Sequence, residues 1–528
     1  MSTTLISKAR AIAGPSRSVS GARTRTRTRT ALPARRGLAS VVSESSAGRT
    51  APPPPPSPPP APRSPRAEGD IGSVFASLSG ETEQPFPERF LDLKRSIIGD
   101  ADNQARLRHS WTTLTERLAQ LAPEIERKQQ ACIPQTTYEA FIENPSKELI
   151  EDIKSCGTVI VRNAVSEEEA LQWLEETRAY LALNPQVKGF PADDKQVFEI
   201  YWSKAQLAAR AHPRSLAVQR ALLTLFSAPP TAPVSLLTPL TYADRLRIRN
   251  PGDAKFALGP HSDGGSIERW EDPNYRKVYE RILQGKWEDF DAWQIEHRAV
   301  ANQDMYHGAG SCGVFRAFQG WTSMSHTGPN EGTLRVFPYL REMTAYLMLR
   351  PLFREKRFRA ELDHESYLAA DNWELDTEST RFANSALGRC QEYNDETHPH
   401  LELSRTMVSI PQVRPGDQAW WHGDMIHAVE ANHRGKGPSA VMYIPSVPLT
   451  PLNADYVRDQ REMFLAARPP PDFPGGVGES SFKGTGRAED IEGLAGRNAM
   501  GLEPFEITGD LTEGERSARQ QANKVLGF

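Results

Sequence analysis

Two short stretches, far apart in the sequence, carry the feature that most limits what this chain can fold into. The first holds His261 and Asp263 with one residue between them and Gly264-Gly265 directly after, and the second ends in His427. Side chains at positions i and i+2 of a strand point to the same face, so His261 and Asp263 can contact one ion. A third imidazole would complete a two-histidine, one-carboxylate facial triad, which leaves three coordination positions open on iron(II). The sequence therefore predicts an iron(II) site formed by these two stretches.

Both the third ligand and the presence of a metal have alternatives. His422 competes with His427 for the third position, because it lies on a predicted strand, Gln418–His422. His261 and Asp263 could also form a capped turn with a surface salt bridge and hold no metal. The two glycines after Asp263 favour a binding site, since glycine lets the backbone come close to a ligand.

The composition of the 528 residues is that of a globular protein, with 38% hydrophobic and 25% charged residues. This length has room for several domains or for one large domain with insertions. No apolar run is long enough to cross a membrane, so we expect no membrane span. We expect neither a disulfide framework nor a thiolate zinc site, because no CxxC spacing links the four cysteines, Cys132, Cys156, Cys312 and Cys390.

Residues 1–50 differ from the remainder in charge. They contain ten Lys or Arg residues and one acid, Glu44, and they are rich in serine and threonine. This composition is typical of a mitochondrial transit peptide; the alternative is a disordered basic tail that touches anionic surfaces, on a cytoplasmic protein. The remainder has 53 basic and 66 acidic residues, a formal charge of −13, and no basic stripe with interleaved aromatics. We therefore expect a small-molecule substrate and no nucleic-acid partner.

Four further regions are predicted along the chain: a proline-rich linker (51–71), a helical packing region (72–156), a mixed region of strands and helices (157–465) and a polar C-terminal extension (466–528). Proline makes up half of residues 51–70, and such a stretch cannot pack a core. The helical region has an apolar stripe at helical spacing, formed by Leu107, Trp111, Leu114, Leu118 and Leu121. We find no catalytic constellation in that region. The C-terminal extension is expected to form a helix at about 512–525.

The mixed region alternates strand and helix signals. β-branched runs and two-residue alternation predict strands at 157–162, 242–250, 255–258, 331–338, 418–422 and 440–444. A capping box at Ser166 predicts a helix that runs toward Leu183, and residues 205–226 are also helical. The segment between Asp263 and His427 is too long for a sheet alone. Helical patterns at 275–287 and within 340–405 predict a helical cap over the site, where substrate would be selected.

One predicted strand carries three basic residues on a single face. Arg245, Arg247 and Arg249 alternate with apolar residues within Tyr242–Asn250. Such a face is more often solvated than a substrate clamp, and we favour the solvated interpretation.

The order of these features resembles a known superfamily. A strand, the His-x-Asp motif, inserted segments, a Gly-Thr-Leu strand, a Pro-Gly-Asp turn, a histidine and a closing strand follow one another, as in the iron(II)/2-oxoglutarate dioxygenases. More closely, the chain resembles the YbiU-like proteins, a family of unknown function in that superfamily. The matching segments are Tyr201–Gln206, Tyr242–Trp270, Phe315–Trp321 and Trp421–Pro445, and the resemblance covers roughly residues 150–465. It implies an α+β fold with a double-stranded β-helix core, a cupin-like jelly roll with flanking helices and a helical insertion.

The resemblance also implies an activity. An enzyme of this kind holds iron(II) through His261, Asp263 and His427, with 2-oxoglutarate as cosubstrate on two open positions and dioxygen on the third. It would oxidise an aliphatic C–H bond of a small molecule, while the protein orients the reactants and excludes water. The order of motifs favours His427 over His422. Two other functions stay open, namely a metal-dependent hydrolase or cupin-type isomerase, and a non-catalytic binding protein.

The base that would hold the distal carboxylate of 2-oxoglutarate departs from the superfamily pattern. Its usual place corresponds to residues 437–439, which carry no Arg or Lys. Arg434 is the preferred substitute, because arginine can hold a carboxylate with two parallel hydrogen bonds. Arg247 and Arg249 are the next candidates, and Arg335 is a weaker one.

Overall fold

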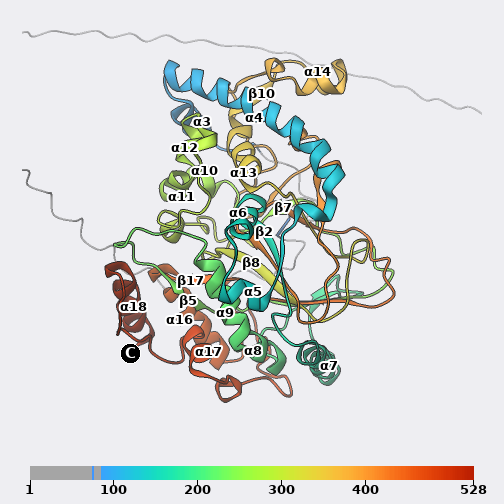
Figure 1. The fold of residues 1–528 in the computed structure, drawn as a ribbon, viewed down its shortest axis with the longest axis vertical. Helices are drawn as coiled ribbons and strands as arrows, with labels where there is room; N and C mark the ends of the chain where they lie inside the picture. Colours follow the sequence, from blue (N-terminus) through green and yellow to red (C-terminus); the bar gives the residue numbers. More distant parts are fainter. Residues whose placement is uncertain (1–73, 76–84) are drawn as a thin grey trace, which may run out of the picture. The chain divides into compact units, whose positions relative to one another are not determined.

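The computed structural model describes residues 74–75 and 85–528, all within one compact unit, Pro62–Phe528. The predicted transit peptide (1–50) and linker (51–71) therefore lie outside the described residues. The fold is mixed α+β, with sheets of eight and five strands and helices packed around them (Figure 1). Within the described part of the chain, no helix is both long and apolar enough to span a membrane.

The larger sheet is antiparallel except at one edge, where β1 and β2 run parallel. Its strands in spatial order are β1 (Gln135–Thr137), β2 (Thr158–Arg162), β14 (Gln418–His422), β8 (Phe318–Ser323), β16 (Ser439–Tyr443), β6 (Leu246–Arg249), β4 (Val197–Phe198) and β3 (Gly189–Phe190). Strands β14 and β8 are buried at every residue, so both faces of the sheet are covered at its centre. The strands predicted at 157–162, 242–250, 418–422 and 440–444 are confirmed as β2, β6, β14 and β16.

The smaller sheet brings together the two stretches that contain His261, Asp263 and His427. Its strands in spatial order are β12 (Gln391–Glu392), β7 (His261–Ser262), β15 (His427–Val429), β9 (Leu334–Val336) and β13 (Val408–Ser409). β15 pairs antiparallel with β7, and His427 is directly opposite His261. Two strand pairs complete the β structure, β5 (Ser235–Leu240) with β17 (Val447–Leu449) and β10 (Phe353–Glu355) with β11 (Trp373–Leu375).

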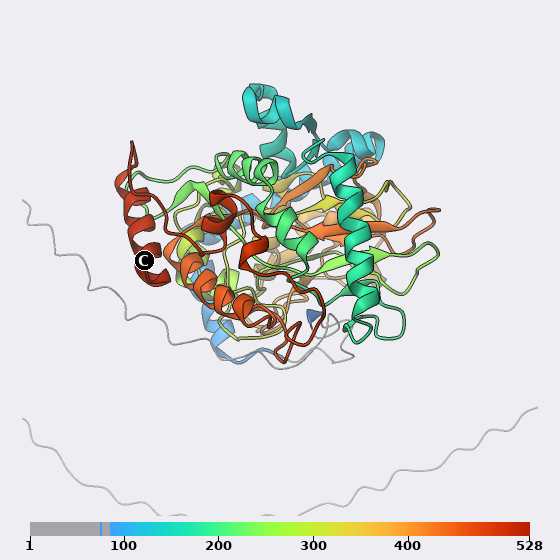
Figure 2. The same cartoon turned by 90° about the horizontal axis from the view of Figure 1, so that it is seen from below.

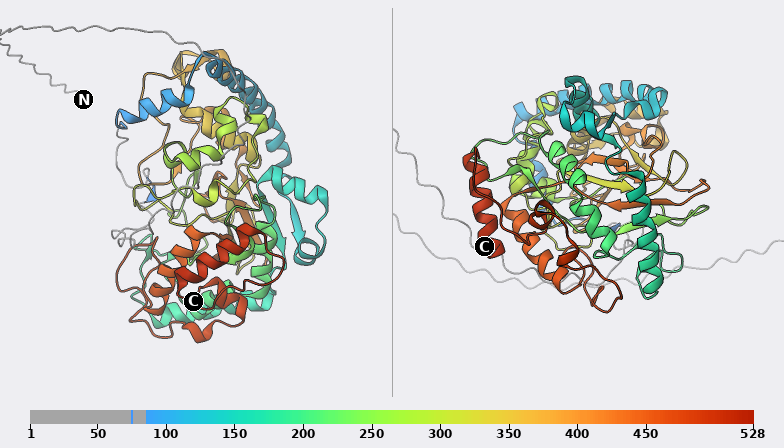
Figure 3. Two further views of the ribbon diagram at one scale, coloured as in Figure 1. Left: turned by 90° about the vertical axis from the view of Figure 1, so that its left-hand side faces the viewer. Right: turned by 60° about the horizontal axis from the view of Figure 1, so that its bottom comes forward.

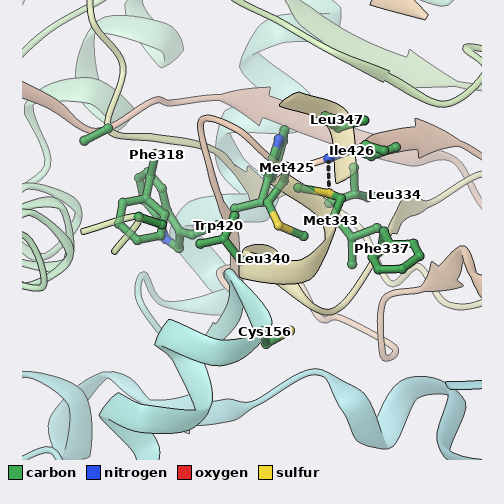
Figure 4. Packing of buried hydrophobic residues seen from close by; sticks show 14 of the residues in the cluster. Cys156, Phe318, Leu334, Phe337, Leu340, Met343, Leu347, Trp420, Met425 and Ile426 are labelled. Atoms are coloured by element: carbon green, nitrogen blue, oxygen red, sulfur yellow. Dashed lines mark hydrogen bonds between the residues drawn. The ribbon is translucent and has the colours of Figure 1, made fainter. Parts of the chain in front are cut away.

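The two sheets share one hydrophobic core. Phe318 and Trp420 of the larger sheet and Leu334 of the smaller sheet belong to the same cluster of buried side chains (Figure 4). Met343 joins this cluster from a helix, and its sulfur accepts a hydrogen bond from the Ile426 amide at 3.1 Å. That contact holds the turn between β14 and β15 in place. Strand β15 begins directly after this turn with His427, so the contact also helps to position His427.

Helices flank the sheets throughout the described part of the chain. Their bounds are α3 (Arg89–Ile98), α4 (Ala101–Lys128), α5 (Tyr138–Glu143), α6 (Lys147–Cys156), α7 (Glu167–Leu183), α8 (Lys204–Ala211), α9 (Pro213–Leu223), α10 (Glu268–Glu271), α11 (Pro273–Val278), α12 (Glu280–Leu283), α13 (Leu340–Leu349), α14 (His364–Leu368), α15 (Leu403–Thr406), α16 (Pro451–Leu465), α17 (Leu494–Ala499) and α18 (Glu513–Leu526). The predicted apolar stripe is the buried face of α4, which packs against α13. Ser166 caps α7 as predicted, accepting a hydrogen bond from the Glu169 amide.

One prediction about local structure was wrong, and one at the C-terminus was confirmed. Residues 255–258 form no strand, because the Asp253 carboxylate accepts hydrogen bonds from the amides of Lys255 and Phe256 and holds them in a turn. The helix expected at about 512–525 is confirmed as α18, which packs on α16 (Figure 2 and Figure 3). Its apolar residues join a second hydrophobic cluster. Ala522 and Leu526 are buried there. Small apolar residues at helical spacing in a charged segment gave too weak a signal for this packing.

Position 320 in β8 requires glycine because the ring of Trp420 occupies the space that a side chain would need. It pairs with Trp420 across the sheet, and a Cβ at this position would come within 2.3 Å of the Trp420 ring. We expect Gly320→Ala to destabilise the fold by about 1–3 kcal/mol, the usual cost of overpacking, seen as a lower thermal midpoint. Gly437→Ala is the matched control, because nothing lies within 4 Å of its Cβ position. Equal midpoints for the two variants would contradict this account of the core.

Candidate metal centre

The structure brings His261, Asp263 and His427 to one point. Nε2 of His261 lies 3.7 Å from Oδ1 of Asp263, and Nε2 of His427 lies 3.8 Å from Oδ2. One potential ligand atom from each residue lies within 4.8 Å of the other two, a spacing that a single ion can bridge. In the described ranges, this is the one group of three His, Cys, Asp or Glu side chains with such geometry.

Backbone carbonyls set the orientation of both imidazoles. Nδ1 of His261 donates to the carbonyl of Gly259 at 2.7 Å, and Nδ1 of His427 donates to that of Met425 at 3.1 Å. A carbonyl only accepts, so Nδ1 carries the proton and the lone pair of each Nε2 faces Asp263. Burial, reinforced by His261, lowers the pKa of His427 to about 3, so its ring is unprotonated at neutral pH. Both rings are thus ready to ligate a cation.

Asp263 is the most open of the three residues. Its side chain is 25% exposed, against 4% and 6% for His261 and His427. Burial raises the pKa of Asp263, but the charges of His427, His261 and Arg316 outweigh it and hold this pKa well below the usual range. Arg316 lies 3.8 Å from Oδ2, and the Cys390 thiol donates to Oδ1 at 3.4 Å. The carboxylate is therefore ionised and held from two sides.

A cavity of about 120 Å³ adjoins the triad. Its polar lining includes Arg247, Gln319 and Tyr443, and Trp421 also contributes to the wall. Nε of Arg247 and Nε1 of Trp421 are buried and have no hydrogen-bond partner among the described residues. Buried donors are rarely left unpaired, so the cavity is suited to a ligand that carries acceptor oxygens.

The predicted arginines occupy three different places. Arg247 lines the cavity, whereas Arg249 is used by the fold: it pairs with Asp253 at 2.6 Å and donates to three backbone carbonyls. Arg434 lies with Arg335 in a separate hollow, so the structure does not bring the preferred candidate to the triad. The prediction that this arginine face is exposed to solvent was wrong, since Arg247 and Arg249 are 3% and 0% exposed. Strand β6 lies inside the larger sheet, with β16 on one side and β4 on the other, so alternation with apolar residues does not mark a solvent-facing strand here.

His422, the alternative third ligand, lies elsewhere. Its ring packs among Phe226, Trp293 and Phe318, and its Nδ1 accepts a hydrogen bond from the Asp424 amide at 3.1 Å. Burial lowers the pKa of His422 to about 4, as expected for a neutral core histidine. The geometry places His427, and not His422, beside His261 and Asp263.

Sequence reasoning missed two residues that border the triad from the N-terminal region. Val74 and Phe75 both line the cavity, and the Phe75 ring meets the His261 ring edge to face at 4.8 Å. The carbonyl of Val74 accepts a hydrogen bond from the amide of Cys390, whose thiol contacts Asp263. Their position just after a proline-rich stretch gave no signal that they reach the site.

Phe75 is expected to shield from solvent an ion held by the triad. Because an apolar shell controls access to a metal site, Phe75→Ala should speed removal of bound iron by a chelator on the order of tenfold. Phe358→Ala is the control, since that ring is 66% exposed. Equal release rates in both variants would show that Phe75 does not cover the centre.

Comparison with known proteins identifies the family. The profile of the Gig2-like family matches residues 84–502, most of the chain. The chain belongs to the Gig2-like family. The uncharacterised protein YbiU of Escherichia coli K12 is 30% identical over 366 residues, 67% of this Gig2-like chain and 81% of YbiU. The predicted membership of the YbiU-like family is thereby confirmed.

Two solved structures show the same fold as this Gig2-like protein. The GlcNAc inducible gene 2 protein of Candida albicans, GIG2 (DUF1479), superposes with a TM-score of 0.76 at 31% identity, covering 85% of this chain and 96% of that one. A candidate oxidoreductase from Salmonella typhimurium LT2 superposes with a TM-score of 0.66 at 27% identity, covering 80% and 99%.

Proposed function

We propose that this Gig2-like protein is a non-haem iron(II)- and 2-oxoglutarate-dependent oxygenase that oxidises a small molecule. The observation that carries the proposal is the convergence of His261, Asp263 and His427 beside a cavity with unpaired donors. Two imidazoles and one carboxylate on one side of an ion are the donor set typical of iron(II) oxygenases. The description of the Salmonella relative as a candidate oxidoreductase agrees with it.

The residues present fit the ion and its cosubstrate. His261, Asp263 and His427 would hold iron(II), which supplies dioxygen chemistry when bound. The buried rings of His261 and His427 keep their ligand atoms fixed, while the more open Asp263 leaves one side for reactants. Phe75 and Trp421 restrict water around the rings.

We assign the distal carboxylate of 2-oxoglutarate to Arg247. Arg247 is opposite Val441 in the β6–β16 pair, and its Nη2 donates to Oγ of Ser439 at 3.3 Å. Ser439 is within the segment where the superfamily usually carries its base, so Arg247 reaches that place from the neighbouring strand. Its unpaired Nε and the guanidinium fork can hold a carboxylate, with Nε1 of Trp421 as a further donor.

We also interpret the sheets as the two faces of a jelly-roll core. The larger and smaller sheets are antiparallel except for the β1–β2 edge, and they share one hydrophobic cluster. In double-stranded β-helix enzymes the site lies between two such sheets, and here Arg247 comes from one sheet and His261 and His427 come from the other.

The activity test is succinate formation. We expect the full chain to convert 2-oxoglutarate slowly to succinate in air when iron(II) is supplied, and not when zinc replaces it. A matched sample of Asp263→Ala should give no succinate above background. Turnover of an ester or isomerisable substrate with zinc or manganese, and no succinate with iron, would favour the hydrolase or isomerase. Absence of metal binding would leave a non-catalytic binding protein.

A further inference from the structure

A second cavity, of about 370 Å³, adjoins the metal centre. Both cavities are bordered by the same five residues, Val74, Asp244, Arg245, Asp263 and Arg316. Asp263 is the most open of the proposed ligands, so a molecule in the second cavity approaches the ion from that side. The volume is near the lower end of about 300–1,000 Å³ for small-molecule sites, which indicates a small metabolite.

Loops, and not the predicted helical cap, wall this cavity. Residues 307–312 and 387–390 supply one side, and residues 472–474 from the C-terminal extension supply another. The two inserted loops touch so closely that a Cβ on Gly308 would lie 1.9 Å from the Gly388 carbonyl oxygen. Ser311 is 5% exposed, and its hydroxyl has no hydrogen-bond partner among the described residues. An unpaired buried hydroxyl in a cavity wall is a feature of a binding site.

Two arginines lie where the cavities meet, and their hydrogen-bonding capacity is little used. Nε of Arg245 is 3.5 Å from Asp244, and Nη2 of Arg316 is 3.8 Å from Asp263. Both contacts are longer than the 2.7–2.9 Å typical of a strong charge-assisted hydrogen bond. The guanidinium of Arg245 lies 5.0 Å from the Phe473 ring and that of Arg316 lies 5.5 Å from the Tyr242 ring. The aromatic rings hold the guanidinium groups in place without using their N–H donors.

The charges around the triad leave one positive charge unbalanced. The metal cavity is lined by three arginines and two aspartates, Arg245, Arg247, Arg316, Asp244 and Asp263. An imidazole that ligates an ion adds no charge, and the charge of iron(II) is cancelled by the two carboxylates of 2-oxoglutarate. Arg389 and Asp472 balance each other in the remainder of the second cavity. A substrate with one negative charge completes the balance.

We propose that the second cavity binds the substrate through an anionic group, a carboxylate or a phosphate, held between Arg245 and Arg316 with Ser311 as a further contact. This inference rests on the proposed function, since it takes the ion and 2-oxoglutarate to occupy the first cavity. It assigns Arg247 of β6 and Arg245, which directly precedes that strand, to different ligands. Cationic molecules and long apolar chains are excluded as substrates.

The test measures anion binding without turnover. The full chain is loaded with nickel(II) in place of iron and saturated with 2-oxoglutarate, then titrated calorimetrically with acetate or with inorganic phosphate. We expect saturable one-site binding of at least one anion, with acetate and phosphate separating the two chemistries. Arg245→Gln should weaken anion binding at least tenfold, and by a larger factor than it weakens 2-oxoglutarate binding. Ser311→Ala, which alters no charge, should weaken anion binding several-fold.

The outcomes separate this proposal from the proposed function. If 2-oxoglutarate does not bind, the proposed function fails, and the titrations are repeated with nickel alone. Saturable anion binding that depends on Arg245 then still supports the second cavity. Arg434→Gln is the control for a lost surface charge, because Arg434 lies outside both cavities. Absence of saturable binding of either anion, or equal anion affinity in Arg245→Gln and Arg434→Gln, overturns the proposal.

Discussion

Replacing His427 by alanine is expected to reduce iron(II) affinity by roughly a hundredfold or more, because it removes one of three ligands and leaves the ion to water. Asp263→Ala should have an equal or larger effect, since it removes the one negatively charged ligand of the three. The measurement is an anaerobic competition with a coloured chelator. Neither variant should fold differently, because both side chains face a cavity.

The control for this prediction is the other histidine in the same segment. His422→Phe keeps an aromatic ring among Phe226, Trp293 and Phe318, and it should leave iron affinity unchanged. If His422→Phe lost iron and His427→Ala kept it, the assignment of the third ligand would be reversed. If neither variant lost iron, the centre would not be a metal site.

Arg247→Gln is expected to weaken 2-oxoglutarate about a hundredfold, corresponding to roughly 3 kcal/mol, while iron affinity is maintained. The cause is loss of a charged partner for a carboxylate in a cavity with little solvent. Binding is measured calorimetrically with nickel(II), which prevents turnover. Circular dichroism would check that the variant is folded.

Arg434→Gln tests whether Arg434, the candidate preferred from sequence, or Arg247, the candidate indicated by the structure, holds the distal carboxylate of 2-oxoglutarate. Because Arg434 lies in a separate hollow, this variant should bind 2-oxoglutarate as the unmodified protein does. Loss of affinity in Arg434→Gln with normal binding in Arg247→Gln would restore the candidate preferred from sequence. Loss in both would indicate that the loop carrying Arg434 moves when the ligand binds.

Features with a local cause were predictable from the sequence. The apolar stripe of α4 and the Ser166 cap of α7 depend on neighbours within a few turns, and both were recognised. The His-x-Asp motif placed two of the three clustered residues, because alternation along a strand fixes which side chains share a face. His427 required the order of motifs along the chain in addition.

Features that depend on pairing between distant strands were not predictable. Arg247 and Ser439 meet only because β6 pairs with β16, and no local pattern encodes that register. The same pairing buries the arginine face that looked solvated. Val74 and Phe75 are held beside the triad by a backbone hydrogen bond to Cys390, a ring contact with His261 and a small hydrophobic cluster with Phe256, none of which has a sequence signature.

The central claim is that His261, Asp263 and His427 hold one ferrous ion and leave room for a chelating oxo acid. Its most direct test is the visible absorption of the anaerobic protein as iron(II) and 2-oxoglutarate are added in turn. The account predicts a charge-transfer band that requires both additions, saturates at one equivalent of iron and is absent in Asp263→Ala. No band with the intact protein, or the same band with Asp263→Ala, would contradict it.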